Sequence, residues 1–191
     1  FLELYQAGKL TNAHKELDTG LSAWNLAMGS QELYDWLDAE PQLFHPGDLD
    51  YIHSVERISK LSNVISINGG VQLDLMGQEN AESTGTRQLS GVGGQMDFLE
   101  GAYRSKGGKG FICINSSRVT KDGERKSNIL ATIPGGSTIS APRTMIQYVA
   151  TEYGIASLSG KTLRERAEAM ASIAHPDFRE ELMKYARENF K

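Results

Sequence analysis

Glycine is concentrated in one stretch of this sequence. Of the 20 glycines, 11 lie between Gly69 and Gly110. Glycine loses more conformational freedom on folding than any other residue, so such a concentration requires a structural or functional reason. Tight turns between short strands supply that reason at many of these positions. The middle of the chain is therefore expected to consist of short strands joined by turns.

Apolar runs mark the strands themselves. Strands are predicted at residues 64–67, 111–114, 128–133 and 146–151. Val71, Leu73 and Leu75 alternate with Gln72 and Asp74, which predicts a half-exposed strand. The segment 121–123, Lys-Asp-Gly, is a good turn between two strands.

The two ends of the chain carry helical signals. Residues 1–7 are predicted to form the end of a helix capped by Gly8. An apolar strand at 21–28, a glycine turn and a helix at 31–38 then begin an α/β unit, and a loop is predicted from Pro41 to Gly47. The tail is predicted to hold a helix at 163–173 with a Thr162/Glu165 capping box, and a last helix entered at Pro176. Residues 1–191 are thus expected to form one α/β domain with an open sheet flanked by helices.

The first residues also bear on completeness. The chain opens on Phe1-Leu2-Glu3, apolar and helix-like, with no methionine and no capping residue before it. We therefore expect the sequence to be a piece of a longer protein.

Composition excludes several classes of partner and site. The net charge is −4, whereas nucleic acids and anionic membranes attract basic surfaces. No apolar stretch approaches the length needed to span a bilayer. The single cysteine, Cys113, excludes an internal disulfide, and the four histidines show no metal-ligand spacing. A cytoplasmic protein without a metal is expected, with Cys113 as a buried side chain in a strand.

Two glycine-rich segments are candidates for chemistry. Gly91, Gly93 and Gly94 precede polar Gln95, which suits a loop whose backbone N–H groups face an oxyanion or a phosphate. Tight turns remain the alternative explanation. Lys106 and Lys109 lie among further glycines and either contact phosphates or form a solvated basic turn. Neither segment matches the dinucleotide-binding or P-loop pattern.

The ordered motifs of the chain resemble those of the acetyl-CoA hydrolase/transferase family, which includes 4-hydroxybutyrate, butyrate and succinate:acetate CoA-transferases. The likeness runs from about residue 1 to the end. The matching words are Ser66-Ile-Asn68, Leu73-Asp-Leu-Met-Gly-Gln78, Asn80-Ala-Glu-Ser83, Arg87-Gln-Leu-Ser-Gly-Val-Gly-Gly-Gln-Met-Asp-Phe98, Ser105-Lys-Gly-Gly-Lys109, Pro142-Arg-Thr144, Thr151-Glu-Tyr-Gly-Ile-Ala156, Gly160-Lys-Thr-Leu-Arg-Glu-Arg-Ala167 and Ala174-His-Pro-Asp-Phe-Arg179.

The resemblance implies the C-terminal half of an enzyme with a CoA-transferase (NagB/RpiA-like) fold. Two similar halves then enclose the active site, and a glutamate attacks the acyl-CoA to give covalent intermediates. That glutamate is expected just upstream of residue 1, so Glu3 is not its equivalent and the isolated chain is expected to be inactive. The implied substrates are an acyl-CoA and a small carboxylic acid, with CoA as substrate and no permanently bound cofactor.

Individual roles carry over by position. Gly94 matches the glycine whose amide supports the acyl oxygen, and Gly91, Gly93 and Gln95 share its loop. Glu152 matches a glutamate that pairs with a lysine near the CoA site, and Lys121 is the expected partner.

Other matching positions concern the two substrates. Lys106 and Lys109 are expected to contact CoA phosphates. Asn68 and His53 are expected to bind the acyl substrate, although many relatives have asparagine where His53 stands.

Two rival functions share all of these motifs. The first is an acyl-CoA hydrolase with water as the acceptor, and the second is a CoA-binding or assembly module without catalysis. The expected partners are the N-terminal half of the same enzyme and the two substrates, and a homo-oligomer is left open. The transferase is the preferred prediction.

Overall fold

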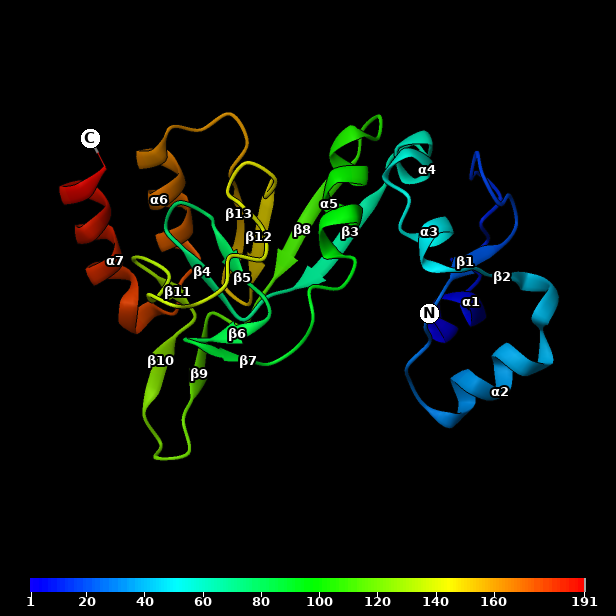
Figure 1. The fold of residues 1–191 in the computed structure, drawn as a ribbon, viewed down its shortest axis with the longest axis horizontal. Coiled ribbons are helices and arrows are strands. Elements are labelled where there is room, and N and C mark those ends of the chain that lie inside the picture. The colour runs from blue at the N-terminus through cyan, green and yellow to red at the C-terminus, as the bar shows by residue number, and fades with distance from the viewer. Residues whose placement is uncertain (191) are drawn as a thin grey trace.

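The computed structural model describes residues 1–190. A main body begins at β3, and a smaller N-terminal part lies apart from it at the opposite end of the molecule (Figure 1). The N-terminal part and the link to the main body contain α1 (Leu2–Gln6), β1 (Ser22–Trp24), α2 (Gln31–Ala39), a 3-10 turn (Pro41–Leu43), β2 (Phe44–Pro46), α3 (Leu49–Ile52) and α4 (Val55–Lys60).

Local signals placed most of the N-terminal elements correctly. Gly8 follows α1 with φ +66°, as expected for a glycine cap, and the Ser30 side chain caps α2. The predicted strand at 21–28 is shorter, because only β1 is extended. The predicted loop at 41–47 is wrong in part, since β2 lies there and pairs parallel with β1. The Trp36 ring packs against Phe44 and supports this pairing.

The main sheet has four strands in the order β13-β12-β8-β3. Its strands are β3 (Ile65–Gly69), β8 (Lys109–Cys113), β12 (Tyr148–Thr151) and β13 (Gly154–Ser157). The first three run parallel, so their carboxyl ends lie at one edge, and β13 returns antiparallel to β12. Helix α5 (Gln95–Arg104) packs on β3 and β8. The predicted α/β class is confirmed, and the finer NagB/RpiA-like assignment stays a prediction.

Only one face of this sheet is covered within the described residues. Ile112 and Val149 point into the core and are fully buried. Ile67 and Ile155, on the opposite face, are 69% and 63% exposed. Cys113 lies on this uncovered face, so the prediction that it is buried is wrong. An apolar run establishes a strand, but it does not establish that both faces are covered.

A second, smaller sheet lies beside the first. It contains β11 (Ile129–Leu130), β4 (Gln72–Asp74) and β5 (Glu79–Asn80), in that order. The strand predicted at 71–75 is present as β4, but the prediction that it is half-exposed is wrong, because Gln72 and Asp74 are 5% and 1% exposed. Their polar atoms find partners inside the protein, since Asp74 accepts hydrogen bonds from the backbone and side chain of Gln78.

Two hairpins extend from this region. Strands β6 (Ser83–Thr84) and β7 (Arg87–Gln88) form one, and β9 (Ser117–Val119) and β10 (Arg125–Ser127) form the other. The turn predicted at 121–123 is confirmed between β9 and β10, with Gly123 at φ +81°.

The C-terminal helices complete the core. Helix α6 (Leu163–Ser172) begins with the predicted Thr162/Glu165 capping box, and α7 (Pro176–Asn189) begins at the predicted proline. Leu182 is buried, and Phe178 packs against the same cluster. None of the helices in residues 1–190 combines the length and apolar character needed to cross a bilayer.

Candidate active site

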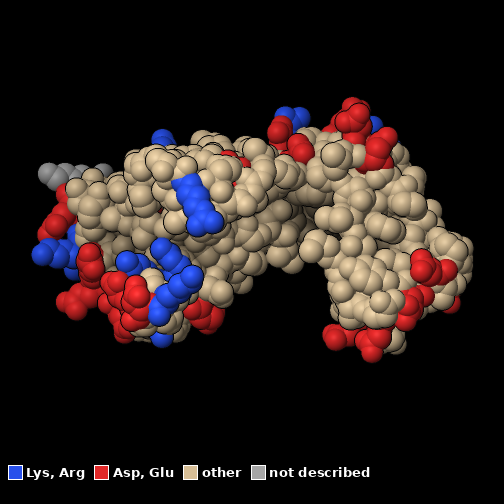
Figure 2. All heavy atoms as spheres, turned by 60° about the horizontal axis from the view of Figure 1, so that its bottom comes forward, with Lys and Arg blue, Asp and Glu red and all other residues tan. Residues whose placement is uncertain are grey.

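A hollow of about 920 Å³ lies between the N-terminal part and the beginning of α5. Figure 2 shows the molecule hollowed between its two parts, with mostly uncharged atoms along the visible walls. No lysine or arginine of residues 1–190 lines it. The lining residues are Asn25, Leu26, Gly47, Asp48, Leu49, Asp50, His53, Asn68, Gly93, Gly94, Gln95 and Phe98. The structure thus brings together five predicted site residues: His53, Asn68, Gly93, Gly94 and Gln95.

The glycine-rich loop leads directly into a helix. Gly93 has φ +63°, a conformation that favours glycine, and Gly94 is the N-cap of α5. No side chain caps this helix, and the first intrahelical bond runs from Phe98 N–H to the Gly94 carbonyl at 3.2 Å. The N–H groups of the first turn therefore lack intrahelical partners and carry the positive end of the helix dipole. Such an arrangement can stabilise an oxyanion at the hollow.

His53 lies directly against this turn. A β-carbon added at Gly94 would lie 2.1 Å from His53 Cε1 and 2.2 Å from Nδ1. The imidazole also packs edge-on against Phe98, with 5.1 Å between the ring centroids. A side chain at position 94 would therefore force the imidazole or the first turn of α5 to move.

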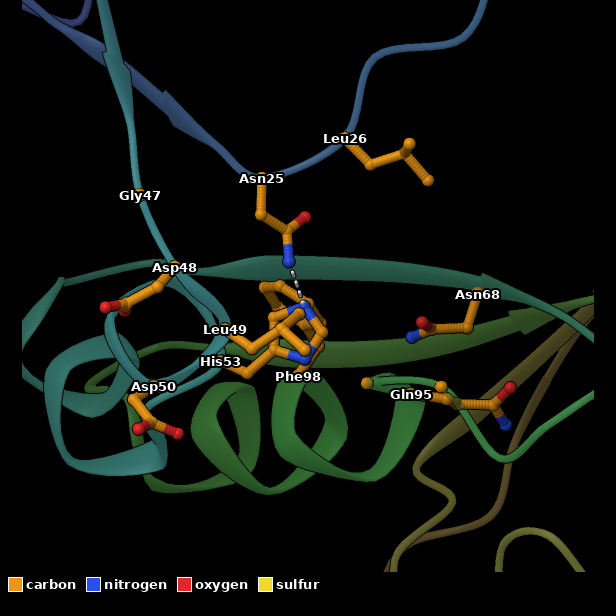
Figure 3. Close-up of a pocket in the computed structure, with 12 residues that line it drawn as sticks. Asn25, Leu26, Gly47, Asp48, Leu49, Asp50, His53, Asn68, Gln95 and Phe98 are labelled. Carbon is orange, nitrogen blue, oxygen red and sulfur yellow. Dashed lines mark hydrogen bonds between the residues drawn. The ribbon is translucent and has the colours of Figure 1, made fainter.

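Two polar groups hold the His53 ring. Its Nε2 lies 3.0 Å from Asn25 Nδ2 (Figure 3). Its Nδ1 lies 3.5 Å from an oxygen of Asp97. Because the Nδ2 group of Asn25 donates, Nε2 of His53 accepts, and Nδ1 carries the proton that faces Asp97. Asn25 and Asp97 thereby hold the orientation of the imidazole at the wall of the hollow.

Gln95 connects the hollow to a buried acid beneath it. The Gln95 side chain donates a hydrogen bond to Oε2 of Glu79 on β5. Burial of Glu79 raises the pKa of its carboxyl to about 8, and the Gln95 hydrogen bond opposes this only in part. Glu79 was not singled out by sequence reasoning, because nothing in the local pattern distinguishes it from a solvated carboxylate.

Asn68 reaches the hollow from β3. Figure 3 shows the Asn68 side chain at the hollow. Its amide donates to the Ser66 hydroxyl at 2.7 Å, which orients it. Asn68 lies near the carboxyl end of β3, the edge at which ligands commonly bind in open α/β sheets. Asn25 was missed by sequence reasoning, although a polar residue inside the apolar run 21–28 was a usable signal.

Glu152 lies after β12 and makes a different contact from the one predicted. Its two carboxylate oxygens accept hydrogen bonds from the Ser116 backbone N–H at 2.9 Å and the Ser116 hydroxyl at 2.6 Å. Burial raises the pKa of Glu152, but these hydrogen bonds outweigh it and lower the pKa below its usual value. Lys121 lies in the turn between β9 and β10, and residues 1–190 contain no ion pair between it and Glu152. Ser116 is therefore the partner of Glu152 in this structure, and the pairing with Lys121 stays a prediction.

The remaining predicted residues lie outside the hollow. Gly91 is exposed in the loop before Gly93, with open space around it. Lys106 and Lys109 are exposed and follow the far end of α5. Helix α5 has ten residues, so about 15 Å separates these lysines from Gly94. The structure does not bring them to the hollow, and their role as phosphate contacts stays a prediction.

Comparison with known proteins gives consistent matches. The family description "Acetyl-CoA hydrolase/transferase C-terminal domain" matches residues 29–186. The chain is 43% identical over 186 residues to butyryl-CoA:acetate CoA-transferase of Anaerostipes caccae, covering 97% of this chain and 42% of that protein. It is also 43% identical over 189 residues to 4-hydroxybutyrate coenzyme A transferase of Clostridium kluyveri, covering 99% and 43%. An acetyl-CoA hydrolase of Kluyveromyces lactis is more distant, at 30% identity over 188 residues.

Solved structures give the same result. RipA from Yersinia pestis superposes with a TM-score of 0.86 at 38% identity, covering 98% of this chain and 41% of that one. A 4-hydroxybutyrate CoA-transferase from Porphyromonas gingivalis gives a TM-score of 0.80 at 36% identity, covering 99% and 43%. The chain thus spans about two fifths of the length of these relatives.

Proposed function

The chain belongs to the acetyl-CoA hydrolase/transferase family, and from this premise we propose that the protein containing it transfers CoA between an acyl-CoA and a small carboxylic acid. The observation that supports this most directly is the uncapped first turn of α5 beside Gly94, at the wall of the hollow. Among the relatives described above, those named CoA-transferases are more similar to this chain than the one named a hydrolase.

The contribution of this chain to the reaction follows from that turn. When a carboxylate attacks a thioester, the carbonyl oxygen gains negative charge as the tetrahedral intermediate forms. The N–H groups at Gly94 and Gln95 are proposed to donate to that oxygen, as fixed donors in a partly enclosed site. The attacking carboxylate is proposed to come from the part of the enzyme preceding Phe1. Expulsion of the CoA thiolate then leaves an anhydride between the acyl group and the enzyme's carboxylate. The thiolate attacks the enzyme's own carbonyl in that anhydride, which releases the original acid as a carboxylate and forms an enzyme–CoA thioester. The acceptor carboxylate then runs these steps in reverse and leaves as the new acyl-CoA.

His53, Asn25 and Asn68 are proposed to bind the acyl substrate. The Asn25 and Asn68 amides each retain one N–H that can donate to a substrate, and His53 supplies the ring that fills the wall between them. Gly91 and Gly93 are proposed to shape the glycine loop. Lys106 and Lys109 are proposed to contact the CoA phosphates away from the hollow. The enzyme is proposed to work in the cytoplasm with no permanent cofactor. Its active site is proposed to be closed by an N-terminal half, and a homo-oligomer is compatible with this arrangement.

Product analysis on the complete protein tests the proposal. Butyryl-CoA is supplied with and without acetate, and acetyl-CoA and free CoA are both quantified. Formation of acetyl-CoA that depends on acetate is the expected result. Release of free CoA at the same rate without acetate would establish the hydrolase instead, and no reaction with either acceptor would reject both enzymatic functions.

A further inference from the structure

Glu79 is held rigidly beneath the candidate active site. Its backbone N–H donates to the Ala141 carbonyl at 3.0 Å, and its carbonyl accepts from Ser140 N–H at 2.8 Å. Leu73 of β4 pairs with it on the other side. Glu79 has no exposed surface. A side chain anchored in this way can transmit its position to whatever it binds.

The carboxyl group of Glu79 contacts the active-site wall through one residue. Its Oε2 accepts from the Gln95 side chain, which belongs to the first turn of α5. Its Oε1 has no hydrogen-bond partner among residues 1–190 and lies against Gly70, where a β-carbon would come within 2.6 Å of it. Glycine at position 70 therefore leaves the room that this carboxyl group occupies.

The surroundings of Glu79 favour a neutral acid. The titratable side chains on the packed elements are Asp74 of β4, Glu82 after β5, Asp97, Glu100, Tyr103 and Arg104 of α5, and Arg143 after the Ala141 bridge. None of them contributes to the raised pKa, whose causes are burial and the Gln95 hydrogen bond. A buried carboxylate without a cation is strongly disfavoured, so the group retains its proton at neutral pH.

We propose that Glu79 is a positioning residue that, as a buried carboxylic acid, holds Gln95 and thereby aims the first-turn N–H groups of α5 at the acyl oxygen. This inference rests on the proposed transferase function. The neutral state is essential to it, because a negative charge on Glu79 would lie close to the developing oxyanion and oppose it. A role confined to packing would require the volume of the side chain but not its proton.

The dependence on pH has a definite sign. Below about pH 8 Glu79 is protonated in the folded protein, and above it the group ionises. Turnover is therefore expected to fall as pH rises through about 8. Because the folded state retains a proton that the unfolded state releases at lower pH, stability also declines as pH rises from the acidic range toward about 8.

Three variants of the complete protein test the proposal. The measurement is kcat for CoA transfer from butyryl-CoA to acetate, at neutral and at alkaline pH. Glu79→Gln keeps the shape and cannot ionise, so it is expected to lose the alkaline fall in kcat. Glu79→Ala releases Gln95 and is expected to lower kcat by up to about 10²-fold, the effect of a 1 Å misplacement. Glu82→Gln changes another buried glutamate and is the matched control, expected to retain the alkaline fall. An unchanged alkaline fall in Glu79→Gln would overturn the proposal.

A second measurement keeps the inference separate from the proposed function. Hydrogen exchange is followed in the peptide covering residues 90–98. Faster hydrogen exchange in Glu79→Ala, but not in Glu79→Gln or Glu82→Gln, supports the positioning role. This holds even if the CoA-transfer assay shows no turnover in any variant. Equal rates of hydrogen exchange in all variants would overturn the positioning role. Absence of CoA transfer in the unmodified protein would reject only the proposed function.

Discussion

Replacement of Gly94 by alanine tests the candidate site most directly. The added β-carbon would lie 2.1 Å from His53 Cε1, whereas ordinary contact begins at 3.4 Å. One of the two groups must therefore move by about 1.3 Å, the difference between those distances. Either the imidazole leaves its place beside Asn25 and Asp97, or the first turn of α5 shifts away from the hollow.

Both movements have measurable consequences. Overpacking of this kind costs about 1–3 kcal/mol of stability. Misdirecting an oxyanion donor costs about 10²–10³-fold in turnover. We expect kcat to fall by that factor in the complete protein, with a much smaller change in the Kd for CoA. Thermal unfolding of the same variant separates the loss of stability from the loss of turnover.

The clash itself is tested by a double-mutant cycle with His53→Ala. Removing the imidazole provides space for the new methyl group, so Gly94→Ala is expected to lower kcat less in the His53→Ala background. Gly135→Ala is the matched control, because it adds the same methyl group where no atom lies within 4 Å. An equal effect of Gly94→Ala in both backgrounds would refute the clash, and unchanged turnover would place the oxyanion donors elsewhere.

The remaining predictions concern Glu152 and the tail. The changes in the free energy of unfolding caused by Glu152→Gln and Ser116→Ala are expected to be non-additive, because the two side chains are hydrogen-bonded. The changes caused by Glu152→Gln and Lys121→Ala are expected to be additive. The reverse result would support the Lys121 pairing. Because the folded-state pKa of Glu152 is lowered, its stabilisation is present near neutral pH and is lost as pH falls below the ordinary range of a glutamate, which urea unfolding at several pH values can follow. Thr162→Ala removes the cap of α6 and is expected to cost about 1 kcal/mol in the free energy of unfolding, while Thr162→Ser retains most of it.

Sequence reasoning succeeded where the determinant is local. The Thr162/Glu165 capping box, the proline at the start of α7 and the glycine after α1 each depend on neighbouring residues, and all were placed correctly. Burial was predicted less well. Burial was assigned to Cys113 from an apolar run and half-exposure to the strand holding Asp74 from alternation, yet the exposure of both depends on which elements cover each face of the sheet.

The same distinction applies to the site. The glycine loop around Gly94 was identified because its composition is unusual over a few adjacent residues. The partners of this loop were not identified, because the residues in contact are far apart in the sequence. Asn25 and His53 are separated by 28 positions, and Glu79 and Gln95 by 16. Periodicity carries no information about such contacts. The helix beginning at Gln95 was also missed, because Gln95 was assigned to the glycine loop that precedes it.

The charges around the hollow indicate how this chain can stabilise an anion. No lysine or arginine of residues 1–190 lines the hollow, whereas the carboxylates Asp48 and Asp50 do, and Asp97 lies against His53. The positive potential that this chain supplies therefore comes from the dipole of α5 and from oriented N–H groups. Stabilisation by dipoles depends on distance and direction far more than stabilisation by a full charge does. A neutral Glu79 that fixes Gln95 and a glycine that fits beneath His53 are both consistent with a site whose effect depends on geometry.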